Sequence, residues 1–496
     1  MRPAFLLKST FTFLPVFTLG FSLLSTPGQC LAATVEFNGL SYANLGLVGV
    51  GRLPADQRDK FGETFGSFSD FTLDASSWKR NDDGSYTGTL YAQPDRGYNL
   101  TGTTNYIPRQ NRLTIRLVPA SGSEGKADNL SLTLADTVLY TEADGSPLTA
   151  FDPTPAGAAA RPNFPPLPQA YNGRISLDAE GLVRLADGSF FVSDEYGPYV
   201  YRFSETGKLL AAIRPPETFI PKRRGVDSFS SNNAGPDHAP PSPAEPDSGR
   251  ANNQGFEGLS LTPDAKTLFV LLQSATHQDG GTGGSAPRRH TRLLKYDISA
   301  DTTQPRLTGD YVVALPEVQQ PGKRARTAPQ SAIVAISPTR LLMLSRGSGG
   351  AGGETPASNF RQITFVDFTA ATNLLGTPYE QTTAVAPGGT LAAAVTPAQT
   401  APFIDINDDA ELKKFALSNG PVSGATNLAE KWEALTLAPV LDPKKPDDFF
   451  LLVGNDNDFQ TMRGFQDGQA YKAENEIDSM ILVYRVTLPG LNSAKP

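Results

Sequence analysis

The sequence is poor in cysteine and histidine. Its 496 residues include one cysteine, Cys30, and three histidines, His238, His277 and His290. One cysteine cannot form a disulfide within the chain, and a chain of this length does not need such cross-links to be stable. The histidines all lie in loop-like sequence, so we do not expect a His-rich zinc site.

Several catalytic motifs are also missing. We find neither the glycine-rich P-loop nor the dinucleotide-binding fingerprint. The Gly-x-Ser-x-Gly elbow of serine hydrolases is absent as a strand–turn–helix unit, and Gly347-Ser348-Gly349-Gly350 lies in a Gly-rich stretch without that context. The sequence therefore carries no convincing nucleophile motif.

Glycine and proline are abundant, with 46 and 41 residues, and 39% of the residues are hydrophobic. These values indicate many short strands joined by turns around a large core. The formal net charge is −8. This acidic balance, without a basic stripe, argues against nucleic acid as a partner.

The N-terminus has the pattern of a secretory signal peptide. Arg2 and Lys8 precede an apolar run from Phe11 to Leu24, and small residues at Ala32 and Ala33 offer a cleavage site. The run is short and contains a proline, which is less typical of a membrane anchor. We therefore predict a signal peptide over 1–33 and a secreted, extracellular protein with no stable membrane span after its removal.

The mature chain is expected to be one domain over 34–490, and we expect a monomer. Two sequons, at Asn99 and Asn129, predict N-glycosylation if the source is eukaryotic.

One short phrase recurs along the chain. It reads Asp-Ala-Glu-Gly-Leu at 178–182, Gly-Phe-Glu-Gly-Leu at 255–259 and Trp-Glu-Ala-Leu at 432–435. Each copy opens a strand-like run, and a second apolar run follows it. The second runs end in polar clusters: Ser193-Asp194-Glu195-Tyr196-Gly197, Gln273-Ser274 and Gly454-Asn455-Asp456-Asn457-Asp458.

The repeat predicts a β-propeller, because the segment 180–213 holds four short strands in the length of one blade. The N-terminal region supplies a further unit when Asp70 is aligned with the glutamates. We count five clear units and expect six or seven four-stranded blades, since a closed ring removes exposed strand edges. Long loop insertions are predicted near 152–170, 215–254, 277–290, 347–359 and 376–402.

One unit lacks the glutamate. Matching Ile336-Ser337-Pro338 to Leu261-Thr262-Pro263 places Ala332 at the position of Glu257. This unit is therefore expected to contribute no carboxylate at that position.

The starts of the first strands and the ends of the second strands should converge on one rim of the channel. Several carboxylates would then lie close together, which is unfavourable unless their pKa values rise or a cation binds. Hard oxygen ligands suit Ca²⁺. We predict a calcium site from Glu180, Glu257, Glu433, Asp194 and Asp456, with Glu257, Asp194 and Glu433 also catalytic.

Other interpretations of the same residues remain open. Asp194 and Asp456 lie in segments whose residue types are also typical of ordinary turns. The glutamates could instead bond to backbone amides and hold blades together. Arg96, Arg346 and Lys431 are predicted to bind an anionic substrate, although single basic residues of this kind often form blade-to-blade ion pairs.

With these motifs in view, the chain resembles the phytase-like propeller family, labelled "esterase-like activity of phytase". The resemblance rests on the glutamate phrases, on Arg292-Leu293-Leu294-Lys295-Tyr296-Asp297 and on Asn455-Asp456-Asn457-Asp458-Phe459, and it spans about 37 to 487. Within this family, the chain is similar to a fungal secreted member. The resemblance implies a propeller related to calcium-dependent phytases, although no block matches their catalytic motifs residue for residue.

Three functions follow as hypotheses. The first is a Ca²⁺-dependent phosphoric ester hydrolase acting at the carboxylate-lined mouth on a small phosphorylated substrate. The second is a lactonase or carboxylesterase on the same scaffold, with an ester substrate. The third is a propeller that binds a carbohydrate or protein without catalysis.

Overall fold

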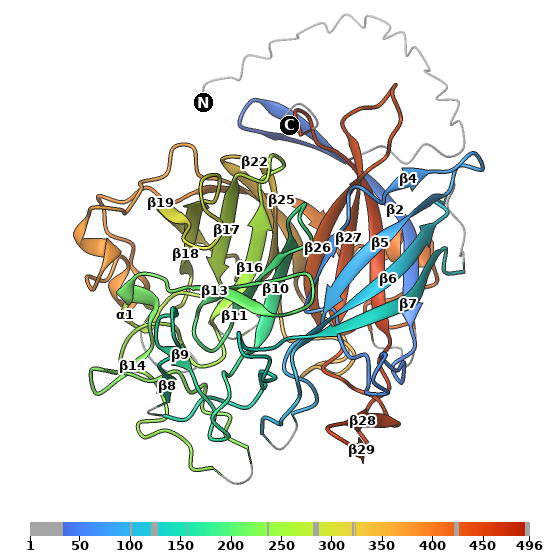
Figure 1. Cartoon of the computed structure of the whole chain (residues 1–496). Coiled ribbons are helices and arrows are strands. Elements are labelled where there is room, and N and C mark those ends of the chain that lie inside the picture. The colour runs from blue at the N-terminus through green and yellow to red at the C-terminus, as the bar shows by residue number, and fades with distance from the viewer. Residues whose placement is uncertain are drawn as a thin grey trace, which may run out of the picture. The chain divides into compact units, whose positions relative to one another are not determined.

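The computed structural model describes residues 33–99, 102–120, 127–155, 157–235, 238–280, 287–319, 322, 324–420 and 426–491. The predicted signal peptide, apart from Ala33, lies outside the described residues. In the described part of the chain, five large antiparallel sheets carry most of the strands (Figure 1).

Each large sheet is one blade, and its strands are named in order from the innermost outward. Blade 1 contains β3 (Asp70–Leu73), β5 (Tyr86–Gln93), β6 (Arg109–Leu117) and β7 (Leu130–Leu139), with β4 (Lys79–Arg80) paired to β5. Blade 2 contains β10 (Ala179–Arg184), β11 (Phe190–Asp194), β12 (Val200–Phe203) and β13 (Leu209–Ile213). Blade 3 contains β16 (Phe256–Leu261), β17 (Thr267–Leu272), β18 (His290–Asp297) and β19 (Arg306–Ala314). Blade 4 contains β22 (Gln330–Ser337), β23 (Arg340–Arg346), β24 (Arg361–Asp367) and β25 (Gln399–Asp405). Blade 5 contains β26 (Lys431–Pro439), β27 (Asp448–Asp456), β30 (Ser479–Thr487), β2 (Leu40–Leu53) and β1 (Ala33–Phe37).

The blades form a closed ring. The innermost strands contact one another in the order β3, β10, β16, β22 and β26, and β26 contacts β3 again. The β-propeller is therefore confirmed, but the prediction of six or seven blades is wrong, because the described residues form five. The five units counted in the sequence are sufficient, because the innermost strand of the fifth blade contacts that of the first.

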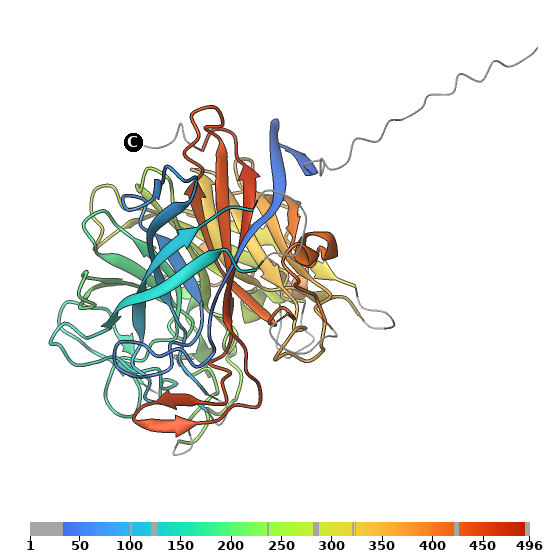
Figure 2. The ribbon, with the colours of Figure 1, turned by 90° about the vertical axis from the view of Figure 1, so that its right-hand side faces the viewer.

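The ring is sealed by pairing the two ends of the domain. The long strand β2 pairs antiparallel with β30, from Ala43 opposite Thr487 to Leu53 opposite Ser479. Figure 2 shows β2 running beside the C-terminal strands. This pairing of an early strand with the last strand protects a strand edge that would otherwise be exposed.

Apolar side chains fill four of the five blade interfaces. One buried cluster joins blades 4 and 5, a second joins 5 and 1, a third joins 2 and 3, and a fourth joins 3 and 4. The remaining interface differs. There the apolar cluster of blade 2 packs mainly on the connection between Tyr140 and Leu177, and blade 1 adds only the partly buried Tyr91.

Most of the smaller elements lie in the connections. They are the hairpins β8 (Ala158–Ala159) with β9 (Leu167–Pro168), β14 (Lys222–Arg223) with β15 (Val226–Asp227), β20 (Glu317–Val318) with β21 (Arg326–Thr327) and β28 (Gly464–Gln466) with β29 (Gln469–Tyr471), and the helices α1 (His277–Gly280), α2 (Asp409–Lys413), η1 (Glu217–Phe219), η2 (Pro378–Glu380) and η3 (Pro387–Gly389). Figure 1 shows β8, β9, β14, β28 and β29 toward one end of the propeller.

The predicted insertion 215–254 is held by two buried arginines. Arg223 donates hydrogen bonds to the carbonyls of Ser228, Ser230 and Pro243, and Arg250 donates to those of Tyr196 and Phe229. The described part of this segment is therefore anchored by hydrogen bonds to the loop that follows β11. The predicted insertion 376–402 ends earlier than expected, because β25 begins at Gln399.

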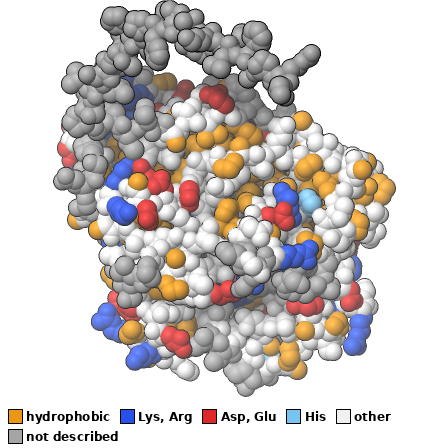
Figure 3. Space-filling model, turned by 180° about the vertical axis from the view of Figure 1, so that it is seen from behind, with side chains coloured by type: hydrophobic (Ala, Val, Ile, Leu, Met, Phe, Trp, Pro, Cys, Tyr) orange, Lys and Arg blue, Asp and Glu red, His pale blue; other side chains and the backbone are white. Residues whose placement is uncertain are grey.

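No helix in the described part of the chain combines the length and apolar character needed to cross a membrane. On the face shown in Figure 3, Lys and Arg side chains are interspersed with Asp and Glu.

Candidate functional site

The recurring glutamate occupies the same irregularity in three blades. In each innermost strand the register with the next strand shifts by one extra residue. The shift lies between Ala179 and Leu182, between Phe256 and Gly258, and between Trp432 and Ala434. Glu180, Glu257 and Glu433 sit in these β-bulges, and each is at least 95% buried. A bulge re-aims a side chain out of the regular alternation of a strand.

Blade 4 has the same bulge with a different side chain. Its register shifts between Gln330 and Ala332, so Ser331 takes the position of the glutamates. The prediction that Ala332 stands there is wrong by one residue. A second irregularity between Ala335 and Ser337 adds a residue to β22, and an alignment anchored on Ser337-Pro338 therefore lands one position late.

A first acidic cluster forms where blades 1 and 2 meet. Asp178, Glu180 and Glu195 each offer a carboxylate oxygen, and these oxygens lie within 4.8 Å of one another. Ser69 Oγ donates to Glu180 Oε2 at 2.7 Å, and the Arg96 guanidinium donates to Asp178 Oδ2 at 2.7 Å. All three carboxylates are buried.

Several oxygens of this region have no donor. Asp178 Oδ1, Glu195 Oε1, Glu257 Oε2 and Asp95 Oδ1 are buried without a hydrogen-bond partner among the described residues. Burial, and then the neighbouring Asp178, raises the pKa of Glu195 to about 8. Burial and the charge of Glu257 raise the pKa of Glu180 well above its ordinary value. Without a bound cation, carboxyl groups of this cluster are therefore expected to stay protonated at a pH at which free carboxyl groups are ionised.

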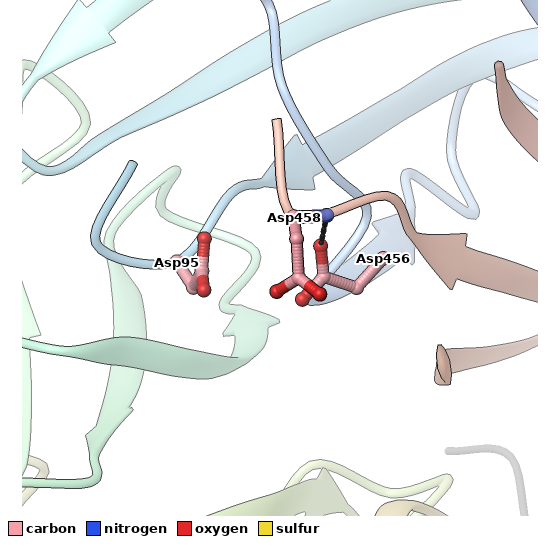
Figure 4. Close-up of side chains that lie close together, drawn as sticks. All are labelled: Asp95, Asp456 and Asp458. Atoms are coloured by element: carbon pink, nitrogen blue, oxygen red, sulfur yellow. Dashed lines mark hydrogen bonds between the residues drawn. The ribbon is translucent and has the colours of Figure 1, made fainter. Parts of the chain in front are cut away.

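A second acidic cluster consists of Asp95, Asp456 and Asp458, whose carboxylate oxygens also lie within 4.8 Å of one another. Figure 4 shows Asp95 arriving from the segment after β5, while Asp456 and Asp458 come from the end of β27. The Asp458 N–H donates to Asp456 Oδ1 at 2.6 Å. Burial and the charge of Asp456 raise the pKa of Asp95 well above its usual range.

Lys431 already neutralises part of this second cluster. Its Nζ forms ion pairs with Asp456 and, at 3.0 Å, with Asp458 Oδ1, and it lies 3.5 Å from Glu433 Oε2. Burial by itself would lower the pKa of Lys431, but the charges of Asp456, Asp458 and Glu433 hold it well above its ordinary value. The first cluster has one basic partner, Arg96, and leaves two carboxylate oxygens without a donor in the described residues, against one in the second cluster, so it is the better cation site.

Glu257 and Glu433 have opposite electrostatic environments. Glu257 Oε1 accepts a hydrogen bond from Gln273, and burial together with the charge of Glu433 raises its pKa well above the ordinary value. Burial would also raise the pKa of Glu433, but its ion pairs with Lys431 and Arg346 outweigh this and lower it. The pKa of Glu257 is thus raised where that of Glu433 is lowered, a difference that suits acid–base chemistry.

Asp194 is engaged by the backbone. Its Oδ1 accepts from the N–H groups of Tyr196, at 2.9 Å, and Asp178, and its Oδ2 accepts from Gly197 N–H at 2.7 Å. Asp194 therefore shapes the turn that carries Glu195, and its predicted catalytic and metal-binding roles stay predictions. Asp70 similarly accepts from the N–H groups of Phe71, Leu182 and Leu435, joining three blades.

The predicted substrate-binding cations all lie in this region, and each is paired. Arg96 contacts Asp178 and Asn253, Arg346 contacts Glu433, and Lys431 contacts the second acidic cluster. Their predicted role is untested.

The two sequons differ in what the structure describes. Asn129 Nδ2 donates to the carbonyls of Val48, at 3.0 Å, and Val118, at 2.8 Å, and its Oδ1 accepts from Val50 N–H. A glycan on this nitrogen would replace one of these bonds. Asn99 lies at the edge of the described residues, and the rest of its sequon falls outside them.

The acidic residues fit a calcium ion. Ca²⁺ binds oxygen ligands at 2.3–2.6 Å, so two oxygens on one ion are at most about 5 Å apart. The first cluster meets this spacing and leaves oxygens without donors. Sequence reasoning did not single out Asp178 as a ligand, although it stands two residues before Glu180, at the start of the recurring phrase.

Comparison with known proteins gives one family and one relative. Residues 63–459 match the family model "Phytase-like: Esterase-like activity of phytase". An "uncharacterized secreted protein" of Arthroderma benhamiae is 40% identical over 471 residues, covering 88% of this chain and 90% of the relative.

Solved structures resemble the chain only distantly. A periplasmic gluconolactonase of Pseudomonas aeruginosa has a TM-score of 0.28 and 11% identity, covering 89% of this chain and 99% of that one. A β-1,3-galactosidase, BT3683, has a TM-score of 0.30 and 10% identity, covering 86% and 99%. Neither likeness bears on function.

Proposed function

Since the chain belongs to the phytase-like family, we propose that it is a secreted, Ca²⁺-dependent hydrolase of phosphoric esters that acts at the carboxylate-lined mouth of the propeller. The observation that carries this proposal is the first acidic cluster. Three buried carboxylates converge there, and two of their oxygens have no donor in the described residues. Buried like charges of this kind are stable only when protonated or when bound to a cation.

A phosphoric ester needs such a cation in order to approach this mouth. The described carboxylates outnumber the three basic side chains, and Arg96, Arg346 and Lys431 are each already paired with an acidic residue. A dianionic phosphate would therefore be repelled by the protein alone. A bound Ca²⁺ would neutralise the phosphate and lower the pKa of an attacking water.

The residues of the chain then divide the work. Asp178, Glu180 and Glu195 would hold the cation. Glu257, whose raised pKa favours its protonated form and whose Oε2 has no partner in the described residues, would donate a proton to the leaving oxygen. Glu433 positions Arg346 and Lys431, which can turn toward phosphate oxygens once the cation reduces the negative charge around them.

The test combines binding and turnover. Thermal unfolding is measured with Ca²⁺ and with chelator, and phosphate release from phytate is measured in parallel. The variant is Asp178→Asn, and its control is Asp144→Asn, an exposed turn aspartate. We expect Ca²⁺ to stabilise the wild type and the Asp144→Asn control but not Asp178→Asn. Phosphate release should likewise be retained in the first two proteins and lost in Asp178→Asn. No stabilisation of the wild type would refute the cation site.

A second candidate is hydrolysis of an uncharged carboxylic ester or lactone. It is favoured by the pairing of all three basic side chains, because an uncharged substrate would not need to displace any ion pair. Ca²⁺-dependent cleavage of aryl acetates or lactones without phosphate release would select this function. Stabilisation by Ca²⁺ without any turnover would instead select a binding propeller.

A further inference from the structure

The interface between blades 1 and 2 contains a cleft of about 450 Å³ lined by both polar and apolar atoms. This volume is in the range of small-molecule sites, about 300–1,000 Å³. It lies at the one blade interface where apolar side chains of both sheets do not form a common cluster. The cleft is separate from the acidic mouth, and none of the residues assigned there to the cation or to acid–base chemistry lines it.

The floor of the cleft follows from strand register. Tyr91 on β5 stands opposite Arg112 on β6, and Arg112 stands opposite Asp136 on β7. The next row on the same face contains Gln110 opposite Val138. Residues paired across antiparallel strands share a face, so these side chains form one continuous surface directed at blade 2.

Gln110 presents an unused donor to this surface. It is 1% exposed and lines the cleft. Arg184 of β10 donates to Gln110 Oε1 at 3.0 Å, which fixes the orientation of the amide. Gln110 Nε2 then has no acceptor in the described residues. A buried amide N–H without a partner costs about 1–3 kcal/mol, a cost that a ligand with acceptor oxygens would remove.

Three basic and two acidic side chains line the cleft, so its net charge is only about +1. Lys60 Nζ pairs with Asp136 Oδ1 at 2.8 Å. The Arg184 guanidinium lies 3.7 Å from the centre of the Tyr91 ring. Arg112 and Glu205 add one charge of each sign. Because most of these charges are already engaged within the protein, the cleft suits an uncharged ligand with many hydroxyl groups, and an anionic saccharide is the competing ligand that the experiment has to exclude.

An exposed aromatic ring completes the cleft. Phe61, in the segment between β2 and β3, lines it and is 51% exposed. An exposed phenyl ring beside hydrogen-bonding side chains offers an apolar face for a flat, partly apolar ring to pack on. Sugar rings combine such a face with a rim of hydroxyl groups. We propose that the cleft between blades 1 and 2 binds a neutral oligosaccharide, with Phe61 packing on a sugar ring and Gln110 donating to its oxygens.

The experiment is isothermal titration of the mature protein with neutral tetrasaccharides of glucose, mannose, galactose, xylose and N-acetylglucosamine, in the presence of chelator. The variants are Phe61→Ala and Gln110→Glu. The second keeps an oxygen for Arg184, removes the donor and adds a carboxylate charge that Arg184 can pair with. The control is Met462→Ala, which alters an apolar side chain with a similar exposed fraction, 49%, outside the cleft.

We expect one sugar class to bind, with affinity about tenfold weaker in each cleft variant and unchanged in Met462→Ala. Unchanged melting temperatures would show that the variants are folded. Three outcomes would overturn the proposal: no binding at about 10 mM saccharide, equal binding by Phe61→Ala or Gln110→Glu, or binding of sulfated or phosphorylated saccharides alone. Because chelator is present, failure of the proposed calcium site would leave this result unchanged.

Discussion

Blade 4 and the three glutamate-bearing blades share a β-bulge at the start of the innermost strand and differ in the side chain that it carries. All four innermost strands have the same β-bulge near their start. Blades 2, 3 and 5 place Glu180, Glu257 and Glu433 in it, whereas blade 4 places Ser331. The bulge therefore does not need a glutamate to form.

This difference separates the fold from the site. A buried carboxyl costs free energy unless it is paired, protonated or bound to a cation. Blade 4 avoids that cost with a small hydroxyl that is 2% exposed. The other three blades carry this free-energy cost, and we infer that their glutamates are retained because they take part in the proposed chemistry. Exchanging the two kinds of side chain tests this inference.

Copying blade 4 into blade 3 should have the largest effect. In Glu257→Ser the leaving oxygen loses its proton donor, and we expect phosphate release from phytate to fall by about 10²–10⁴-fold. Release from p-nitrophenyl phosphate, whose leaving group needs less protonation, should fall less. Stopped and continuous phosphate assays on both substrates measure this.

The control for this prediction is Glu257→Gln, which keeps an oxygen facing Gln273 but cannot act as an acid. It should lose activity like the serine variant while unfolding at the temperature of the wild type. If Glu257→Gln retained wild-type turnover, proton donation by Glu257 would be wrong.

Copying blade 4 into blade 2 should abolish cation binding. A saturating ligand at about 100 times its Kd stabilises a folded protein by about 2.7 kcal/mol. We expect Ca²⁺ to stabilise the wild type by about this amount and Glu180→Ser by less than about 1 kcal/mol. Denaturant titrations with Ca²⁺ and with chelator measure the difference. An equal Ca²⁺ effect in both proteins would place the ion elsewhere.

Much of the fold could be predicted from the sequence, because the phrase around Glu180, Glu257 and Glu433 marks the same strand in successive blades. The number of blades could not be predicted, because it depends on how neighbouring sheets pack against each other, which the repeated phrase does not encode. The five units were visible, but we expected a larger ring.

The site could be predicted only in outline. The three glutamates do lie buried in the same bulges of the innermost strands. The register of Ser331 was missed because two bulges in β22 shift the alternation of that strand. The partners of Asp194 were missed because the sequence does not show where its oxygens point, and in the structure they accept from backbone N–H groups.

The pH dependence of stability should separate the two kinds of blade further. Burial raises the pKa of Asp194 to about 7 and, with Asp178, that of Glu195 to about 8, both above the unfolded values. The folded protein then binds more protons than the unfolded chain, so its free energy of unfolding falls as pH rises through this range.

In chelator we expect a loss of about 3–6 kcal/mol between about pH 5 and pH 8. Saturating Ca²⁺ should reduce this loss, because it stabilises the ionised carboxylates. Urea unfolding at several pH values, with and without Ca²⁺, measures both slopes. A stability that rises with pH in chelator would contradict the pKa directions.

The smallest effect is expected in blade 4 itself. Ser331 Oγ is buried without a hydrogen-bond partner in the described residues, so Ser331→Ala removes a polar atom that forms no bond. Because a buried hydroxyl without a partner is unfavourable, we expect the free energy of unfolding to rise by about 1 kcal/mol. The Ca²⁺ response and phosphate release should match the wild type, as measured in the same assays. Loss of either would mean that the hydroxyl of blade 4 acts at the mouth, and the three glutamates would then be part of a site to which all four bulged blades contribute.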